Sequence, residues 1–122
     1  AAASTRSSVS LGSDGKANFT YFIGDNKVTG GGIVRTKTAG IYSLDKETLA
    51  QGFLFIGAAI TDVDTETHCA QDFSFKVIDN GHKIIITDTD ENSGTACLIF
   101  NVECNGKTYE SADPQVENKE ED

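Results

Sequence analysis

Residues 72–88 read DFSFKVIDNGHKIIITD, two runs of strand-forming residues on either side of Asn80-Gly81. A type I′ turn requires positive φ at both central residues, and Asn-Gly adopts that turn at the least steric cost. The turn and the alternation of apolar residues specify the same strand register. We therefore expect a β-hairpin whose core face carries three cross-strand pairs: Val77 with Ile84, Phe75 with Ile86, and Phe73 with Asp88.

A second hairpin follows around Asn105-Gly106, which joins residues 95–104 to 107–111. Counting outward from this turn places Tyr109 opposite Val102. Alternating residues on the first of these strands share an apolar face made of Leu98, Phe100, Val102 and Cys104.

Upstream, residues 17–23 alternate as a strand does, and short strand patterns occupy 33–36 and 40–43. Residues 53–60 are apolar on both faces, which predicts a central strand covered on both sides. Asp45–Ala50 is the one helical turn that we expect, with Asp45 as its N-terminal cap. The Gly30-Gly31-Gly32 run has no helix pattern after it, so a flexible loop or a close backbone crossing fits it better than a phosphate loop.

These seven to nine short strands, with turn signals about every ten residues, predict an all-β fold. We expect an antiparallel Greek-key β-sandwich of immunoglobulin-like type, with a small β-barrel or jelly roll as the alternative. The expected boundaries are a disordered N-terminal segment at 1–8, a single domain at 9–112 and an acidic C-terminal tail at 113–122.

The chain has 122 residues and a formal net charge of −9, which repels nucleic acid and anionic lipid. No stretch approaches the ~18 consecutive apolar residues of a membrane-spanning helix, so neither nucleic-acid binding nor membrane insertion is expected. Because the chain contains no Met, we expect Ala1 to be a processed end or an expression remnant. A soluble cytoplasmic protein and a secreted one both remain open.

Two acidic loops offer oxygen ligands at alternate positions, which suits a hard cation such as Ca²⁺. One loop contains Asp88, Asp90 and Asn92, followed by a glycine, and the other contains Asp62 and Asp64. If both loops lie at one end of the sandwich, they could share an ion. Turn chemistry alone explains the same composition, because Asp, Asn, Ser and Gly are the usual turn residues.

No catalytic constellation is visible, so we do not expect an enzyme. The chain has two histidines and three cysteines, but no nucleophile–base pair in a recognisable context. Cys97 and Cys104 are seven residues apart on one expected strand, which puts them on opposite faces and too far apart to bond. Cys69 could pair with either, or all three thiols could be reduced.

The C-terminal third carries a recognisable layout: ITDTDENSG at 86–94, NGKTY at 105–109 and DPQVEN at 113–118. It resembles the end of the small bacterial β-domain proteins of the DP-EP family. The resemblance implies a small β-domain, and it implies no activity, cofactor or catalytic residue.

Three functions follow as hypotheses. The first is a non-catalytic binding or assembly protein, in which Phe22, Ile85 and Ile99 on the outer faces form a patch for a homo-oligomer or a protein partner. The second is a calcium-dependent module that uses the acidic loops. The third, a hydrolase or thiol enzyme, lacks a nucleophile–base pair.

Overall fold

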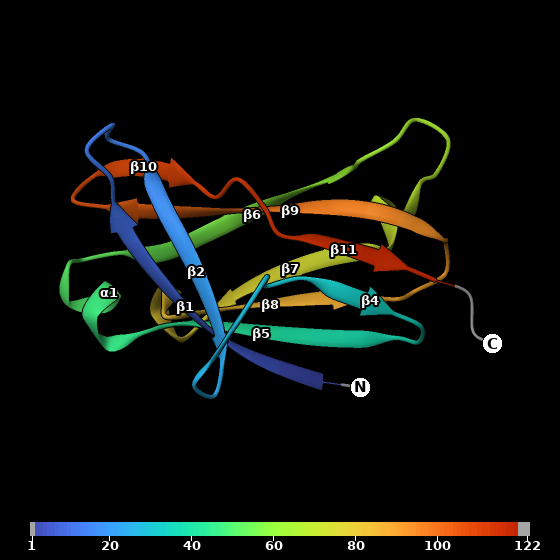
Figure 1. Ribbon diagram of the computed structural model, residues 1–122, viewed down its shortest axis with the longest axis horizontal. Coiled ribbons are helices and arrows are strands. Elements are labelled where there is room, and N and C mark those ends of the chain that lie inside the picture. Colours follow the sequence, from blue (N-terminus) through green and yellow to red (C-terminus); the bar gives the residue numbers. More distant parts are fainter. Residues whose placement is uncertain (1, 120–122) are drawn as a thin grey trace.

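Two β-sheets pack face to face in the protein, whose computed structural model describes residues 2–119 (Figure 1). The first sheet has six strands in the order β3 (Asn26–Val28), β2 (Ala17–Ile23), β1 (Ala2–Leu11), β5 (Thr38–Leu44), β8 (Lys83–Asp88) and β7 (Phe73–Ile78). The second has β10 (Lys107–Glu110), β9 (Gly94–Cys104), β11 (Gln115–Asn118) and β4 (Gly32–Val34), with β6 (Leu54–Asp62) paired to the other side of β9.

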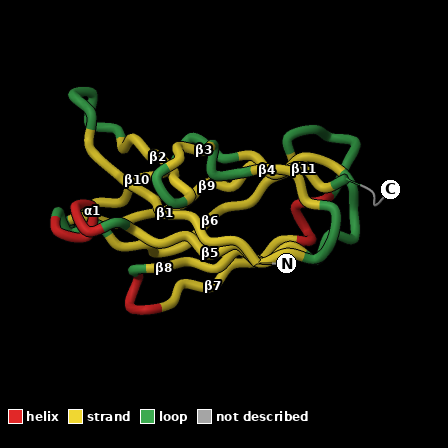
Figure 2. The backbone as a smooth tube through the Cα atoms, turned by 60° about the horizontal axis from the view of Figure 1, so that its bottom comes forward, coloured by secondary structure: helices red, strands yellow, loops and turns green. Residues whose placement is uncertain are grey.

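The prediction of an all-β sandwich is confirmed, and Figure 2 shows its two layers, with β5, β7 and β8 on one side and β4, β9 and β11 on the other. The sheets are mixed, because β1 pairs in parallel with β5 and β11 in parallel with β4. Each of these pairs joins strands that are distant in the sequence, which allows the crossover connection that a parallel pair requires. The immunoglobulin-like arrangement stays a prediction.

Both Asn-Gly hairpins form in the predicted register. Val77 pairs with Ile84 and Phe73 with Asp88, and Tyr109 lies opposite Val102. The first turn includes the 3-10 turn η2 (Asp79–Gly81), with Asn80 and Gly81 at φ values of 54° and 89°. Asn105 and Gly106 have φ values of 52° and 82°, so both turns have the positive values that the sequence requires.

The core lies between the sheets and includes Leu98, Phe100 and Val102, as predicted. Phe75 is a correction, because its side chain is 46% exposed. It belongs to β7, an edge strand, and its ring faces Gly57 on β6, which has no side chain to cover it. Phe75 therefore faces inward but stays exposed, because the sheet ends at its strand.

Strand β6 is also an edge strand, not the central strand that its composition suggests, since it pairs only with β9. Leu54 and Ile56 are exposed, and a β-bulge between Phe55 and Gly57 interrupts its register. A bulge of this kind protects an edge from pairing with another chain.

Both predicted terminal segments take part in the sheets, which corrects the boundaries at 1–8 and 113–122. Residues 2–8 form most of β1, and 115–118 form β11. Thr5 and Ser7 are buried although they are polar, so no apolar period marks this strand in the sequence. Residues 1 and 120–122 lie outside the described residues.

The helical turn forms as predicted: α1 (Lys46–Ala50) begins after Asp45, whose carboxylate accepts a hydrogen bond from the Thr48 N–H at 2.9 Å. The Thr48 hydroxyl in turn accepts a hydrogen bond from the Val9 N–H at 2.9 Å. This hydrogen bond therefore links β1 to the segment that connects the two sheets.

The proposed outer patch does not form. Phe22, Ile85 and Ile99 are each half-buried, and the Arg6 guanidinium covers the Phe22 ring at 4.4 Å. Ile99 lies on the outer face of the other sheet, and three strand spacings, about 14 Å, separate Phe22 from Ile85. A homo-oligomer or protein partner thus remains a prediction without this patch.

Candidate functional site

Three loops and the end of β11 meet at one end of the sandwich, the right-hand end of Figure 1. The three loops are residues 35–37, residues 63–68 and residues 89–93. A Cβ on Gly94 would lie 2.6 Å from the Cβ of Thr67, so the two acidic loops of the sequence do come into contact. The 3-10 turn η1 (Cys69–Asp72) closes the same end (Figure 2).

Two of the predicted calcium ligands, however, accept hydrogen bonds from residues of their own loop or directly after it. The Asp62 carboxylate accepts a hydrogen bond from the Ala70 N–H at 2.9 Å. Asp64 Oδ1 accepts hydrogen bonds from the Glu66 and Thr67 N–H groups and from the Thr67 hydroxyl at 2.7 Å. The hydrogen bonds from Thr67 lower the pKa of Asp64, as expected for a carboxylate that receives several donors.

The other three predicted ligands lie near one another, at a cluster that contains two residues that sequence reasoning missed. We call Asp72, Asp88, Asn92 and Asn118 the polar cluster. Asp72 Oδ2 accepts from the Asn92 N–H at 2.7 Å and from the Glu91 N–H at 2.9 Å. Asp72 Oδ1 accepts from Asn92 Nδ2 at 2.6 Å, so this buried carboxylate organises the 89–93 loop.

Asn118 connects the two buried carboxylates of the polar cluster. Its Nδ2 donates to Asp88 Oδ1 at 3.1 Å, to Asp72 Oδ2 at 3.3 Å and to the Asn92 carbonyl at 3.2 Å. Asp88 Oδ1 accepts a second hydrogen bond from the Asp90 N–H at 2.9 Å. The three acceptors fix the orientation of the amide, because a flipped amide would place its oxygen against them.

Two oxygens of the polar cluster have no hydrogen-bond partner among the described residues: Asp88 Oδ2 and Asn118 Oδ1. Asp88 is only 3% exposed and Asn118 only 2%, so bulk water does not satisfy them. Burial raises the pKa of Asp88, and the nearby Asp90 and Asp72 carboxylates add to the rise, against hydrogen bonds from Asp90 and Asn118 that lower it.

The sequence held signals for both missed residues. The hairpin register places Phe73 opposite Asp88, which puts Asp72 next to the Asp88 loop. Asn118 lies two residues after the buried Val116, and therefore on the same face of β11. Within residues 2–119, no group of three or more His, Cys, Asp or Glu side chains is placed to hold a metal ion.

A pocket of about 260 Å³ lies between the two sheets beside the polar cluster. Asp88 is the only charged side chain among its lining residues. Tyr42 also lines the pocket. Its hydroxyl donates a hydrogen bond to the Gly30 carbonyl, and burial raises the pKa of Tyr42 to about 12, so it is neutral at pH 7. The apolar lining comes from strands of both sheets and includes Val28, Val34, Phe73, Ile86, Leu98 and Val116.

The triglycine segment forms one wall of this pocket and makes the close backbone crossing that its sequence suggested. A Cβ on Gly31 would collide with the Gln115 carbonyl oxygen of β11, and a Cβ on Gly30 would lie 2.6 Å from the Tyr21 ring. Gly40, on the inward face of β5, meets only ordinary contacts, the nearest at 3.5 Å. Glycine at position 40 therefore leaves open space that a side chain would fill.

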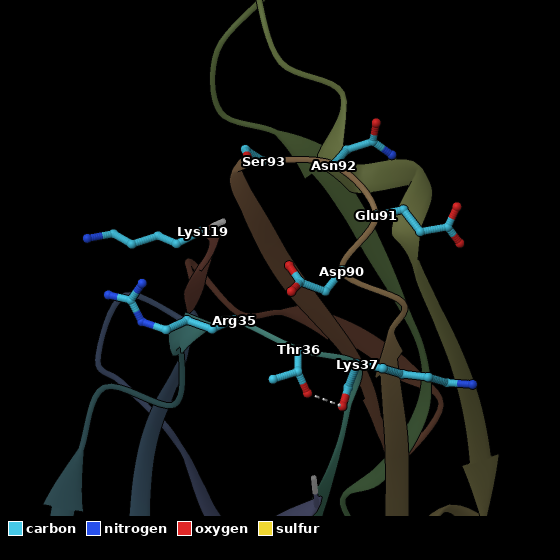
Figure 3. A pocket seen from close by; sticks show the side chains of 8 residues that line it. All are labelled: Arg35, Thr36, Lys37, Asp90, Glu91, Asn92, Ser93 and Lys119. Carbon is cyan, nitrogen blue, oxygen red and sulfur yellow. Dashed lines mark hydrogen bonds between the residues drawn. The ribbon is translucent and has the colours of Figure 1, made fainter. Parts of the chain in front are cut away.

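Figure 3 shows the outer side of the 89–93 loop, a polar hollow of about 690 Å³. Arg35 and Lys119, which directly follow β4 and β11, extend in the same direction there, and the Asp90 carboxylate lies between these two residues and the rest of the loop. The lining mixes three cations with two acids, so it has no dominant charge of either sign. Its neighbour on the inside, by contrast, is the apolar pocket with a single buried acid.

None of the three cysteines forms a disulfide, which selects the reduced alternative. Burial raises the pKa of Cys69 to about 11, with Asp62 as the next contribution, so its thiol stays protonated at pH 7. His68 is exposed although it adjoins the buried Cys69.

The fold defines a small two-sheet β-sandwich with a pocket of about 260 Å³ between its sheets. The chain belongs to the DP-EP family, which matches residues 4–120 and so extends the resemblance of the C-terminal third to nearly the whole chain. A comparison with curated proteins found no match. No helix within residues 2–119 is long and apolar enough to cross a membrane.

Proposed function

We propose that this protein binds a small, largely apolar molecule in the pocket between its sheets. The observation that carries the proposal is a cavity with apolar walls and one buried, incompletely hydrogen-bonded carboxyl group, that of Asp88. Binding sites for small molecules combine a mostly apolar lining with a few placed polar groups. Of the two non-catalytic functions that the sequence predicts, binding and assembly, this proposal corresponds to binding.

The size of the pocket limits its ligand. An apolar cavity of about 150 Å³ is enough to hold benzene. The pocket here, about 260 Å³, therefore suits a molecule somewhat larger than benzene and smaller than a typical drug-sized ligand.

The polar cluster supports the proposal because it holds Asp88 in one position before any ligand arrives. Asp88 Oδ1 receives hydrogen bonds from the Asp90 N–H and from Asn118 Nδ2, and Asn118 is itself held by Asp72. A group fixed in this way loses little conformational freedom on binding, which favours affinity.

The test compares two substitutions on neighbouring residues of β5. Gly40→Val fills the pocket, whereas Ala39→Val adds volume to the opposite face of the same strand. Indole, titrated into ¹⁵N-labelled protein, is expected to shift the amide resonances of pocket residues in the wild type and in Ala39→Val, but not in Gly40→Val. Well-dispersed spectra for both variants would establish that each is folded. No shift in the wild type, or undiminished binding by Gly40→Val, would refute the proposal.

Calcium-dependent binding is the second candidate, favoured by the two unpartnered oxygens of Asp88 and Asn118. An ion that binds only the folded state raises the melting temperature by mass action. Melts in calcium and in a chelator, with Asp88→Asn as the control, test it. Identical melting temperatures at millimolar Ca²⁺ would remove this candidate.

A further inference from the structure

We propose that copies of this protein stack face to face, with the basic outer face of one sheet against the acidic outer face of the other sheet in the next copy. Of the two non-catalytic functions that the sequence predicts, this inference concerns assembly, and it does not depend on the pocket. Three residues define each face: Arg6, Lys76 and Lys83 the basic face, and Glu103, Glu110 and Glu117 the acidic face.

The six-stranded sheet carries cations and no acid on its outer face. Arg6, Lys76 and Lys83 alternate with core-facing residues of β1, β7 and β8, so their side chains point away from the core. Asp88 is the one acidic residue in the described strands of this sheet, and it is buried on the inward face. Arg6 is partly neutralised by Asp45 at 3.7 Å, which leaves the two lysines as the main charges of the basic face.

The other sheet shows the opposite pattern. Glu103, Glu110 and Glu117 alternate with core-facing residues of β9, β10 and β11, so they point outward. Lys107 is the one cation in the described strands of this sheet, and it is on the inward side of β10, with its Nζ over the Tyr109 ring at 5.4 Å. The β7–β8 and β9–β10 pairs lie on opposite sides of the sandwich, so each copy presents one basic and one acidic face (Figure 2).

Two charges on each face have matching positions. Lys76 and Lys83 are diagonal neighbours across β7 and β8, because each lies opposite a residue two positions from the other. Glu103 and Glu110 are diagonal neighbours across β9 and β10 in the same sense. Diagonal neighbours of a sheet are about 7–8 Å apart. Lys76, Glu103 and Glu110 are exposed and Lys83 is half-buried, so two lysines of one copy can meet two glutamates of the next.

The net charge of −9 opposes self-association at long range, but many of the acids that produce it lie away from the stacked faces. Asp14, Asp64 and Glu91, for example, belong to loops. At physiological ionic strength the Debye length is about 8 Å, so salt screens these distant acids more than it screens ion pairs in contact.

The contact joins two different surfaces, so it is heterologous and leaves a free face at each end of a dimer. Stacking therefore continues beyond two copies. Exposed ion pairs contribute little one by one, so we expect a weak association that requires a high protein concentration.

The experiment measures the weight-average mass by analytical ultracentrifugation at protein concentrations up to about 1 mM, which detects dissociation constants in that range. Each sample is measured in about 0.15 M and in about 1 M NaCl, where the Debye length falls to about 3 Å. Two double variants change the faces. Lys76→Glu with Lys83→Glu places acids on both faces, and Glu103→Lys with Glu110→Lys places cations on both.

Two matched controls change the net charge by the same amounts at exposed positions outside both faces. Lys16→Glu with Lys46→Glu matches the first face variant, and Glu47→Lys with Glu66→Lys matches the second. The third comparison is an equimolar mixture of the two face variants, in which acidic faces meet basic ones again.

In 0.15 M NaCl the wild type and both controls are expected to rise with concentration from the mass of one copy to more than that of two, and to return to one copy in 1 M NaCl. Each face variant alone should stay at the mass of one copy, whereas their mixture should associate. Association of the mixture shows that both variants are folded.

A wild type that stays monomeric in 0.15 M NaCl, a face variant that associates as the wild type does, or a mixture that stays monomeric would refute the stacking. Controls that lose association as fully as the face variants would refute it too, since net charge alone would then decide the result. If a monomeric wild type binds poly-L-glutamate and Lys76→Glu with Lys83→Glu does not, the basic face serves an acidic partner, and a second copy is the wrong occupant.

Discussion

Replacing Asn118 with alanine tests whether the polar cluster stabilises the fold. The substitution removes the amide that donates to Asp88 Oδ1 at 3.1 Å and to Asp72 Oδ2 at 3.3 Å. Hydrogen bonds to charged groups contribute about 1.5–3 kcal/mol each. Both distances exceed the 2.7–2.9 Å that is usual for such pairs, so the lower value applies. The expected loss in the free energy of unfolding is therefore about 3 kcal/mol for the two bonds.

That loss corresponds to a large shift in melting temperature. With an unfolding entropy of about 2.1 cal/mol/K per residue and 122 residues, about 3 kcal/mol lowers the melting temperature by about 12 °C. Urea unfolding followed by circular dichroism measures the free energy directly. Asn18→Ala, at an exposed position on β2, is the matched control and should change stability by less than about 0.5 kcal/mol. A loss below about 1 kcal/mol for Asn118→Ala would show that the amide does not stabilise the two carboxylates.

Three further changes have defined outcomes. Asp45→Ala removes the cap that accepts from the Thr48 N–H and should lower the free energy of unfolding by about 1 kcal/mol, whereas Asp45→Asn should be nearly neutral; equal losses would contradict a capping role. Gly31→Ala should abolish cooperative thermal unfolding, because a Cβ there collides with the Gln115 backbone, and a melt like that of the wild type would contradict the close crossing. The folded state raises the pKa of Asp88, so it binds more protons than the unfolded state between the ordinary and the raised value. The stability of the wild type relative to Asp88→Asn should therefore fall as pH rises through that window. A rise, measured by urea unfolding, would show that the pKa of Asp88 is lowered by folding and not raised.

The hairpins were predictable in detail because two independent signals agreed. The Asn80-Gly81 turn fixes which residues face each other, and the alternation of apolar residues fixes which face is buried. The N-terminal cap at Asp45 was predictable for the same reason, since cap chemistry is local.

What the sequence could not show depends on which strands lie at the edges. Phe75 and Ile56 are as apolar as core residues, but both belong to edge strands and are exposed. Thr5 and Ser7 are polar and yet buried, because β1 lies between β2 and β5. Strand order is a non-local property, so neither result follows from local pattern.

The candidate site shows the same limit. The sequence left open whether the two acidic loops meet; they do come into contact, but local hydrogen bonds occupy Asp62 and Asp64. Asp88 joins instead with Asp72, 16 residues away, and with Asn118, 30 residues away. Only the pairing of β11 beside β9 brings the last of these to the cluster.

Strand β11 occupies an interior place in its sheet, between β9 and β4, and it is the partner that holds β4 there. A ribosome must therefore deliver Gln115–Asn118 before β4, synthesised some eighty residues earlier, can dock. Until then the nascent chain is an unfinished sandwich with an open flank. We expect a stop codon just before Pro114 to give a product that cellular proteases degrade.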